Sequence, residues 1–355
     1  MALALKIEKK LKKLGIKETK EFTQEEKNLV ANNVTVSLTM AFPILKSEQA
    51  NILNKIQNAN MFYAKTSENL PKINYIYENH KIYFDESVEI QNITDAMLHE
   101  IIHFMQDVRK KNGKLDRMGL CNFNELSLHG LGINEGAVQY VSAKALNSGV
   151  QTVKTFEIVL RTISPNYYPV LTNLIEQIIF LIGEDELVKA IILNDEEFEN
   201  TFFNTFEENA QDIIKLFDEI INYNVKNNKE IEIKKAKEQV EDKSKTDQLK
   251  NLYIQAQDLI MRTFFEKQYK LLQTEEDVQN LSTKLENYIK LTGKIEINGQ
   301  YYSNCDSFKS KFMNKLDKQL IKIHEQKSKM ALAVVYGGRI NRLLNKIKAL
   351  FKPNV

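Results

Sequence analysis

A short motif near residue 100 combines residue types that can bind a metal ion and activate water. The sequence HEIIH occupies positions 99–103, inside a helix expected from about Thr94 to Lys111. Because four residues turn an ideal helix by about 400°, His99 and His103 point the same way and can bind one zinc ion. Glu100 lies about 100° further round the helix, so its carboxylate can face a metal-bound water and accept its proton.

A catalytic zinc ion usually takes three protein ligands and keeps one position open for water, so a third ligand is needed. The chain has five histidines, and His129 is near enough in sequence to compete for this role. Glu135 lies 32 residues after His103, at the start of a helix expected from about Ile133 to Asn147. Its spacing and helix context favour Glu135, and Gly136 beside it lets neighbouring backbone approach.

The HExxH motif together with Asn134-Glu135-Gly136 and a tyrosine at 140 resembles the gluzincins, zincin metallopeptidases in which a second helix supplies the third ligand. The resemblance covers about Ile73 to Asn147 and extends loosely to Asn194. It implies a zinc peptidase in which His99, His103 and Glu135 hold Zn²⁺ and Glu100 is the general base.

One position departs from the gluzincin pattern. An aspartate usually stands four residues after the ligand glutamate and supports a zinc histidine, whereas this chain has Gln139 there. Support for the ligands must then come from Gln139 or from another group. Gln106 and Asp107, late in the first helix, are further candidates, although polar residues at such positions are commonly exposed.

Peptide hydrolysis also needs a donor for the oxyanion that develops on the substrate. Tyr140 is a candidate catalytic residue for this role, and Tyr167, Tyr168 and His129 are alternative donors. Alternating Ile/Tyr and polar residues over 73–84 predict a hairpin before the metal helix. In the family resembled, a sheet edge at this place pairs with an extended peptide substrate; an ordinary half-buried hairpin is the alternative.

Composition limits the other partners. The chain has 49 basic and 47 acidic residues, a formal net charge of +2, so no strong overall field attracts nucleic acid. Two cysteines are too few for a disulfide framework. No apolar run approaches the ~20 residues of a membrane-spanning helix, and the start of the chain lacks a secretory pattern. We expect a peptide or protein substrate, no stable membrane insertion and a cytoplasmic location, with signal-free export left open.

Scarce glycine and proline predict a mainly helical α+β fold. We expect a basic N-terminal helix at 1–20, a zincin-like metallopeptidase domain with a small sheet at 21–200, and a helical accessory region at 201–355 with a hairpin near 294–302. A capping box at Thr23 and Glu26 predicts a helix start, as does Ser47. The segment Asn224 to Asp247, rich in Lys, Glu and Asn, is either an exposed linker or a solvated helix.

Two other functions are consistent with the sequence. One is a zinc-binding or peptide-binding scaffold without turnover, against which the intact Glu100 argues, because a structural site needs no base. The other is a helical interaction protein in which HEIIH arose by chance.

Overall fold

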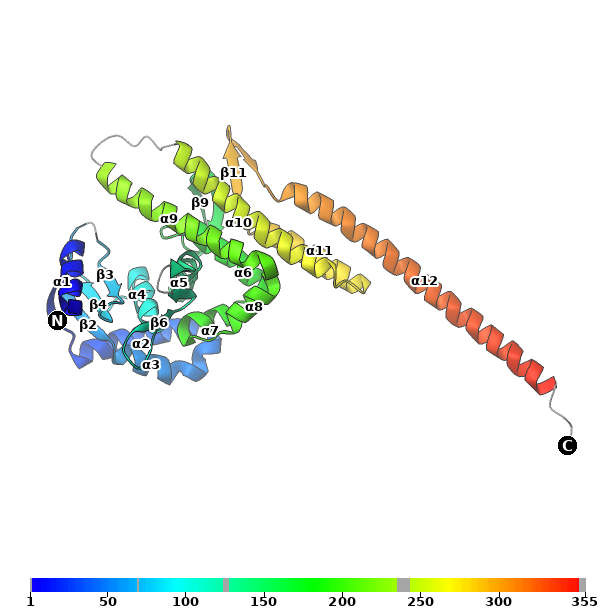
Figure 1. Cartoon of the computed structure of the whole chain (residues 1–355), viewed down its shortest axis with the longest axis horizontal. Coiled ribbons are helices and arrows are strands. Elements are labelled where there is room, and N and C mark those ends of the chain that lie inside the picture. Colours follow the sequence, from blue (N-terminus) through cyan, green and yellow to red (C-terminus); the bar gives the residue numbers. More distant parts are fainter. Residues whose placement is uncertain (1, 69, 124–127, 235–242, 351–355) are drawn as a thin grey trace. The chain divides into compact units, whose positions relative to one another are not determined.

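A computed structural model describes residues 2–68, 70–123, 128–234 and 243–350 (Figure 1). The chain is mainly helical and carries three small four-stranded sheets in this part, which confirms the expected α+β class. It divides into two compact units, Met1–Phe264 with Leu291–Asn304, and Phe265–Lys290 with Cys305–Val355. The first unit therefore extends well past the boundary expected near residue 200.

The first sheet holds the expected hairpin. Helix α1 (Ala2–Leu14) is followed by β1 (Lys17–Glu21), β2 (Asn60–Lys65), β3 (Ile73–Ile76) and β4 (Lys81–Asp85), in the order β1-β2-β4-β3. Strands β3 and β4 are antiparallel, and β2 and β4 are parallel. Strand β3 is thus an edge strand of this sheet, and α1 packs against the sheet through Leu11 and Leu14.

Helix α2 (Gln24–Ala41) begins with the expected capping box, in which Thr23 and Glu26 bond each other's backbone amides. A 3₁₀ turn, η1 (Pro43–Glu48), and α3 (Gln49–Gln57) follow. The expectation that Ser47 caps a helix was wrong, because the residue before α3 is Glu48 and it makes no side-chain cap.

Helix α4 (Asp95–Gln106) carries the HEIIH motif and is capped by Thr94. Its expected end at Lys111 was wrong, because the backbone turns extended at Asp107. Strands β5 (Asp107–Arg109), β6 (Leu115–Met118), β7 (Cys121–Phe123) and β8 (Leu128–His129) form a second, antiparallel sheet. Asn112-Gly113 makes the turn between β5 and β6, where Gly113 has φ +77°, a left-handed conformation that suits glycine.

Helix α5 (Leu131–Ala145) packs beside α4, α6 (Pro169–Ile182) and α9 (Ala210–Lys234). A Cβ on Gly132 would lie 2.1 Å from the Phe217 carbonyl oxygen of α9, so only glycine permits this close approach. Asp218 of α9 accepts hydrogen bonds from the Gly130 and Gly132 amides at 2.9 and 2.8 Å. The start of α5 is therefore fixed at Gly130 and Gly132, which lie five and three residues before Glu135.

The rest of the first unit completes the third sheet and its helices. Its strands β9 (Gln151–Thr155), β10 (Ile158–Thr162), β11 (Lys294–Ile297) and β12 (Gln300–Tyr302) run in the order β12-β11-β10-β9. The expected hairpin near 294–302 is confirmed as β11 and β12. Further elements are α7 (Asp185–Leu193), α8 (Glu197–Phe206), η2 (Glu207–Asn209) and α10 (Lys243–Tyr269). Of the segment expected as a linker or solvated helix, residues 235–242 lie outside the described part.

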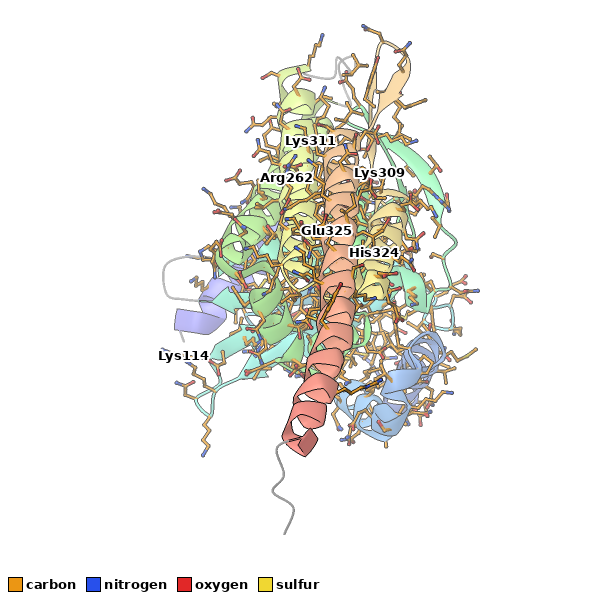
Figure 2. The ribbon with its side chains drawn as sticks, turned by 90° about the vertical axis from the view of Figure 1, so that its right-hand side faces the viewer. Lys114, Arg262, Lys309, Lys311, His324 and Glu325 are labelled. Atoms are coloured by element: carbon orange, nitrogen blue, oxygen red, sulfur yellow. The ribbon has the colours of Figure 1, made fainter. Side chains whose placement is uncertain are left out.

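The second unit is built from the end of α10, α11 (Glu275–Ile289) and α12 (Asp306–Leu350). Buried aromatic rings form its core, with Phe265 against Tyr288 and Phe312. Figure 2 labels polar side chains along α12, namely Lys309, Lys311, His324 and Glu325. No helix in the described part of the chain is both long and apolar enough to cross a bilayer.

Candidate metal centre

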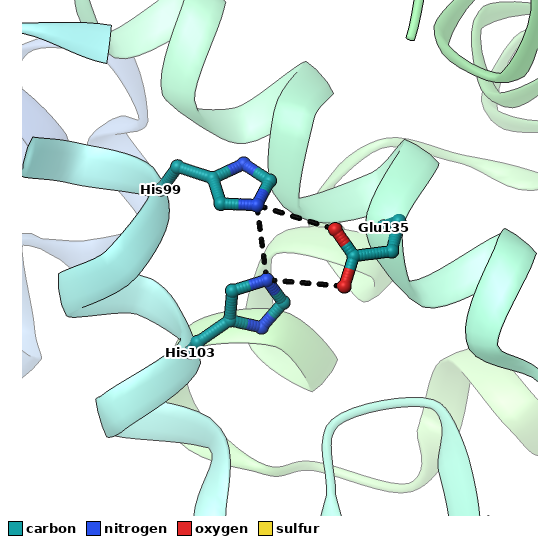
Figure 3. Close-up of side chains that lie close together, drawn as sticks. All are labelled: His99, His103 and Glu135. Carbon is teal, nitrogen blue, oxygen red and sulfur yellow. Dashed lines mark hydrogen bonds and ion pairs between the residues drawn. The ribbon is translucent and has the colours of Figure 1, made fainter. Parts of the chain in front are cut away.

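Helices α4 and α5 bring His99, His103 and Glu135 together (Figure 3). The Nε2 atoms of His99 and His103 lie 3.2 and 3.3 Å from the two Glu135 carboxylate oxygens, and 3.0 Å from each other. Among the described residues this is the one group of three or more His, Cys, Asp or Glu side chains able to share a metal ion. The structure thus assembles the three ligands expected from the sequence.

The hydrogen-bond partners of Gln139 fix which nitrogen of His99 is bare. The Gln139 amide nitrogen donates to Asp95 Oδ2 at 2.8 Å and to Ser164 Oγ at 2.9 Å. The Ser164 hydroxyl must accept there, because its own proton goes to the Tyr167 carbonyl at 2.7 Å. The Gln139 amide oxygen therefore faces His99 Nδ1 at 3.0 Å and accepts its proton, which leaves Nε2 with a free lone pair.

The side-chain amides of Gln106 and Asn134 likewise determine which nitrogen of His103 carries the proton. The Leu120 amide donates to Asn134 Oδ1 at 3.0 Å, which fixes the orientation of that side chain. Gln106 and Asn134 then bond each other at 3.0 and 3.2 Å, and Gln106 Oε1 lies 3.2 Å from His103 Nδ1. His103 Nδ1 is the donor here as well, so its Nε2 is also bare.

Two bare imidazole nitrogens 3.0 Å apart repel each other unless a cation lies between them. Burial alone would lower the pKa of His99, but contact with the Glu135 carboxylate outweighs this and raises the pKa to about 9. Burial likewise raises the pKa of Glu135, yet the two imidazoles hold it well below its usual range. The cluster is thus a preformed cation site, filled by a proton or by a metal ion.

The spacing of the donor atoms is compatible with zinc. Ligand atoms about 2.1 Å from a tetrahedral ion are about 3.4 Å apart. The two Nε2 atoms are 3.0 Å apart, and each lies 3.2 or 3.3 Å from a different oxygen of Glu135. Two imidazoles and one carboxylate form a ligand set of catalytic zinc sites. The residues present therefore fit a zinc ion with an open fourth position.

Glu100 is held beside this cluster without joining it. Its Oε2 accepts a hydrogen bond from the Tyr75 backbone amide at 2.6 Å, so edge strand β3 positions the carboxylate. Burial raises the pKa of Glu100, and His99 and His103 partly oppose that rise. A carboxylate so placed favours taking up a proton.

The candidate oxyanion donors differ in their exposure and in their neighbours. The Tyr140 hydroxyl donates to Glu184, which also accepts from Lys144. The side chain of His129 is 56% exposed, and its Nδ1 lies 3.8 Å from Asp218. Tyr167 is 54% exposed. The Tyr168 ring lies against His99, with centroids 6.3 Å apart and planes 31° apart, so Tyr168 is the candidate whose ring contacts a ligand.

The groups that orient the ligands were only partly expected. Gln139 and Gln106 contact the histidines, whereas Asp107 accepts from Arg109 and from the Tyr75 hydroxyl. Sequence reasoning missed Asp95, Asn134 and Ser164. Asp95 had a signal, because it lies four residues before His99 on the same helix face; Ser164 had none, because its contact with Gln139 depends on the tertiary fold.

Comparison with protein-family models, with curated proteins and with solved structures returned no match to this chain.

Proposed function

We propose that this chain is a zinc-dependent metallopeptidase. In this proposal, His99, His103 and Glu135 hold Zn²⁺, and Glu100 takes a proton from the attacking water. The carrying observation is that both Nε2 atoms face the Glu135 carboxylate, at 3.2 and 3.3 Å from its two oxygens, and lie 3.0 Å from each other. Zinc bound there would lower the pKa of a water molecule and polarise a carbonyl oxygen.

The environment of Glu100 supports its role as general base. One oxygen is occupied by the Tyr75 amide, which leaves the other free to accept a proton and later to return it to the leaving amine. Because burial raises its pKa, the protonated form needed halfway through the reaction is more accessible than for an exposed glutamate.

Strand β3 supports a peptide as the substrate. Lys72 O accepts from Asp85 N, and Asn74 and Tyr83 are opposite each other in the β3–β4 ladder. Since backbone groups alternate between the two sides of a strand, Ile73 and Tyr75 direct theirs away from β4. The Tyr75 amide donates to Glu100. The other backbone groups that point away from β4 suit hydrogen bonds with an extended peptide chain.

The order of elements also supports the proposal, because a sheet with β3 at its edge is followed by the HEIIH helix and then by a second helix that carries Glu135, as the resemblance to zincins implies. Tyr168 is our proposed oxyanion donor in this unit. Its ring lies against His99, and the hydroxyl stays protonated because burial, Glu135 and Glu100 raise its pKa far above neutrality.

The test is the variant Glu100→Gln. A cleaved peptide is first found by mass spectrometry of peptide mixtures incubated with the zinc-loaded protein. Loss of the general base should then lower the rate by about 10²- to 10⁴-fold, with zinc still bound. The exposed Glu89→Gln variant is the matched control.

Two results would contradict the proposal. Wild-type cleavage by zinc-loaded Glu100→Gln would remove Glu100 from the mechanism. Tight zinc binding without cleavage of any peptide would instead favour the scaffold function.

A further inference from the structure

The segment Ile163 to Tyr168 joins β10 to α6 and has a strained end. Tyr168 has φ +45° and ψ +43°, in the left-handed region, which is costly for a residue with a bulky side chain. Conformations of this kind persist only where surrounding contacts impose them. In this conformation the Tyr168 ring lies near His99, so the contacts that maintain it also bear on the metal centre.

Packing on one side of the segment leaves space. A cavity of about 230 Å³ is lined by residues of this segment, including Ser164 and Tyr167, and by Asp95, Leu146 and Gln151. Close packing on that side therefore does not fix the path of the chain. Hydrogen bonds from the segment contribute to the constraint.

The Ser164 hydroxyl makes the bonds that join this segment to a metal ligand. It is 2% exposed, donates to the Tyr167 carbonyl and accepts from Gln139, whose oxygen holds His99 Nδ1. A continuous set of contacts thus runs from His99 through Gln139 and Ser164 to the peptide bond between Tyr167 and Tyr168, and returns through the Tyr168 ring to His99.

We infer that Ser164 is a positioning residue that couples metal binding at His99 to the placement of Tyr168. The inference rests on the proposed metal site and goes beyond its ligands. A metal ion that fixes the His99 ring also fixes Gln139, and through the Ser164 hydroxyl it orders residues 163–168. Because coupling between two equilibria is reciprocal, a loosened segment must weaken metal binding by the same factor.

The experiment measures zinc affinity and backbone hydrogen exchange of residues 163–168 in the full chain, with and without zinc. In the wild-type protein, zinc should slow exchange in this segment by about 10-fold or more. In Ser164→Ala, zinc affinity should fall by about 10- to 100-fold, as for other groups that orient a ligand, and zinc should no longer slow exchange at saturation.

Ser142→Ala is the matched control. Its hydroxyl is also buried, on α5, but has no hydrogen-bond partner among the described residues. It should retain wild-type zinc affinity and zinc-dependent protection. Ser164→Thr keeps the hydroxyl and should recover most of both, which separates the role of the hydroxyl from a general loss of folding.

Wild-type zinc affinity and wild-type protection in folded Ser164→Ala would overturn the inference. Equal losses in Ser142→Ala and Ser164→Ala would also overturn it, because the effect would then be one of core packing. Neither readout uses peptide cleavage, so a chain that binds zinc but cleaves nothing would refute the peptidase and still show this coupling.

Discussion

Glu176, on α6, anchors the start of the same segment and gives a testable pH dependence of stability. Its carboxylate accepts hydrogen bonds from Ile163 N at 3.0 Å and Thr162 Oγ1 at 3.2 Å. Burial nevertheless dominates these bonds and the nearby Arg161, and it raises the pKa of Glu176 from 4.5 to about 7. The folded chain therefore holds a proton at Glu176 at pH values where the unfolded chain has released it.

The size of the effect follows from this difference in pKa. One pKa unit corresponds to about 1.4 kcal/mol, so the rise from 4.5 to about 7 corresponds to roughly 3 kcal/mol. Because the folded-state pKa of this acid is raised, the free energy of unfolding falls as pH rises from about 4.5 to 7 and stays low above that range. Glu176→Gln keeps an acceptor oxygen for both donors and removes the titration.

The assay is urea unfolding of the wild-type and Glu176→Gln proteins at pH 4.5 and pH 8, followed by far-UV circular dichroism. The stability of the variant relative to wild type should increase by roughly 3 kcal/mol between the two pH values. The exposed Glu208→Gln variant is the control and should show no such change. A relative stability of Glu176→Gln that is independent of pH would refute the burial argument.

Three further changes test other parts of the account. Glu135→Ala should weaken zinc binding by roughly 100-fold or more, whereas His129→Ala should leave it unchanged. Calorimetric titration with zinc measures both affinities. The reverse order of the two effects would make His129 the ligand. Asp85 accepts four hydrogen bonds from Thr66 and Ser87, which outweigh its burial and hold its pKa well below the usual range. Asp85→Asn should therefore cost roughly 1–3 kcal/mol at pH 7, a difference that shrinks as pH falls below about 4. Gly132→Ala places a Cβ 2.1 Å from a backbone oxygen and should destabilise the chain by roughly 2 kcal/mol or more, while Gly149→Ala, with open space around it, should not; thermal unfolding measures both.

The sequence predicted the parts of the site that depend on local geometry. The helical spacing of His99 and His103 places their imidazoles on one face without reference to the rest of the fold. Glu135 was expected from its helix context, and the structure supplies the reason that it arrives there: Asp218 fixes the start of α5, and Gly132 allows α9 to approach. That reason lies more than 80 residues further along the chain, and no local pattern indicates it.

The sequence patterns that were misinterpreted are each compatible with two different local structures. The helix that begins near Thr94 was expected to continue to Lys111, but the Asn112-Gly113 pair that follows favours the tight turn of a hairpin, and the strands β5 and β6 lie on either side of it. The same dipeptide at Asn298-Gly299 was correctly predicted as a hairpin, because alternating residues flanked it. Polarity at Gln106 suggested exposure, whereas its amide is fully buried against His103 and Asn134.

Metal content shows whether His99, His103 and Glu135 form a zinc site. The purified protein is loaded with zinc, dialysed and measured by elemental analysis beside the variant His99→Ala/His103→Ala. The variant His129→Ala/His324→Ala, which changes two exposed histidines, is the control. We predict about one zinc ion per chain in the wild type and the control, and none in His99→Ala/His103→Ala. A wild-type chain without zinc, or a His99→Ala/His103→Ala variant with wild-type zinc content, would contradict the account.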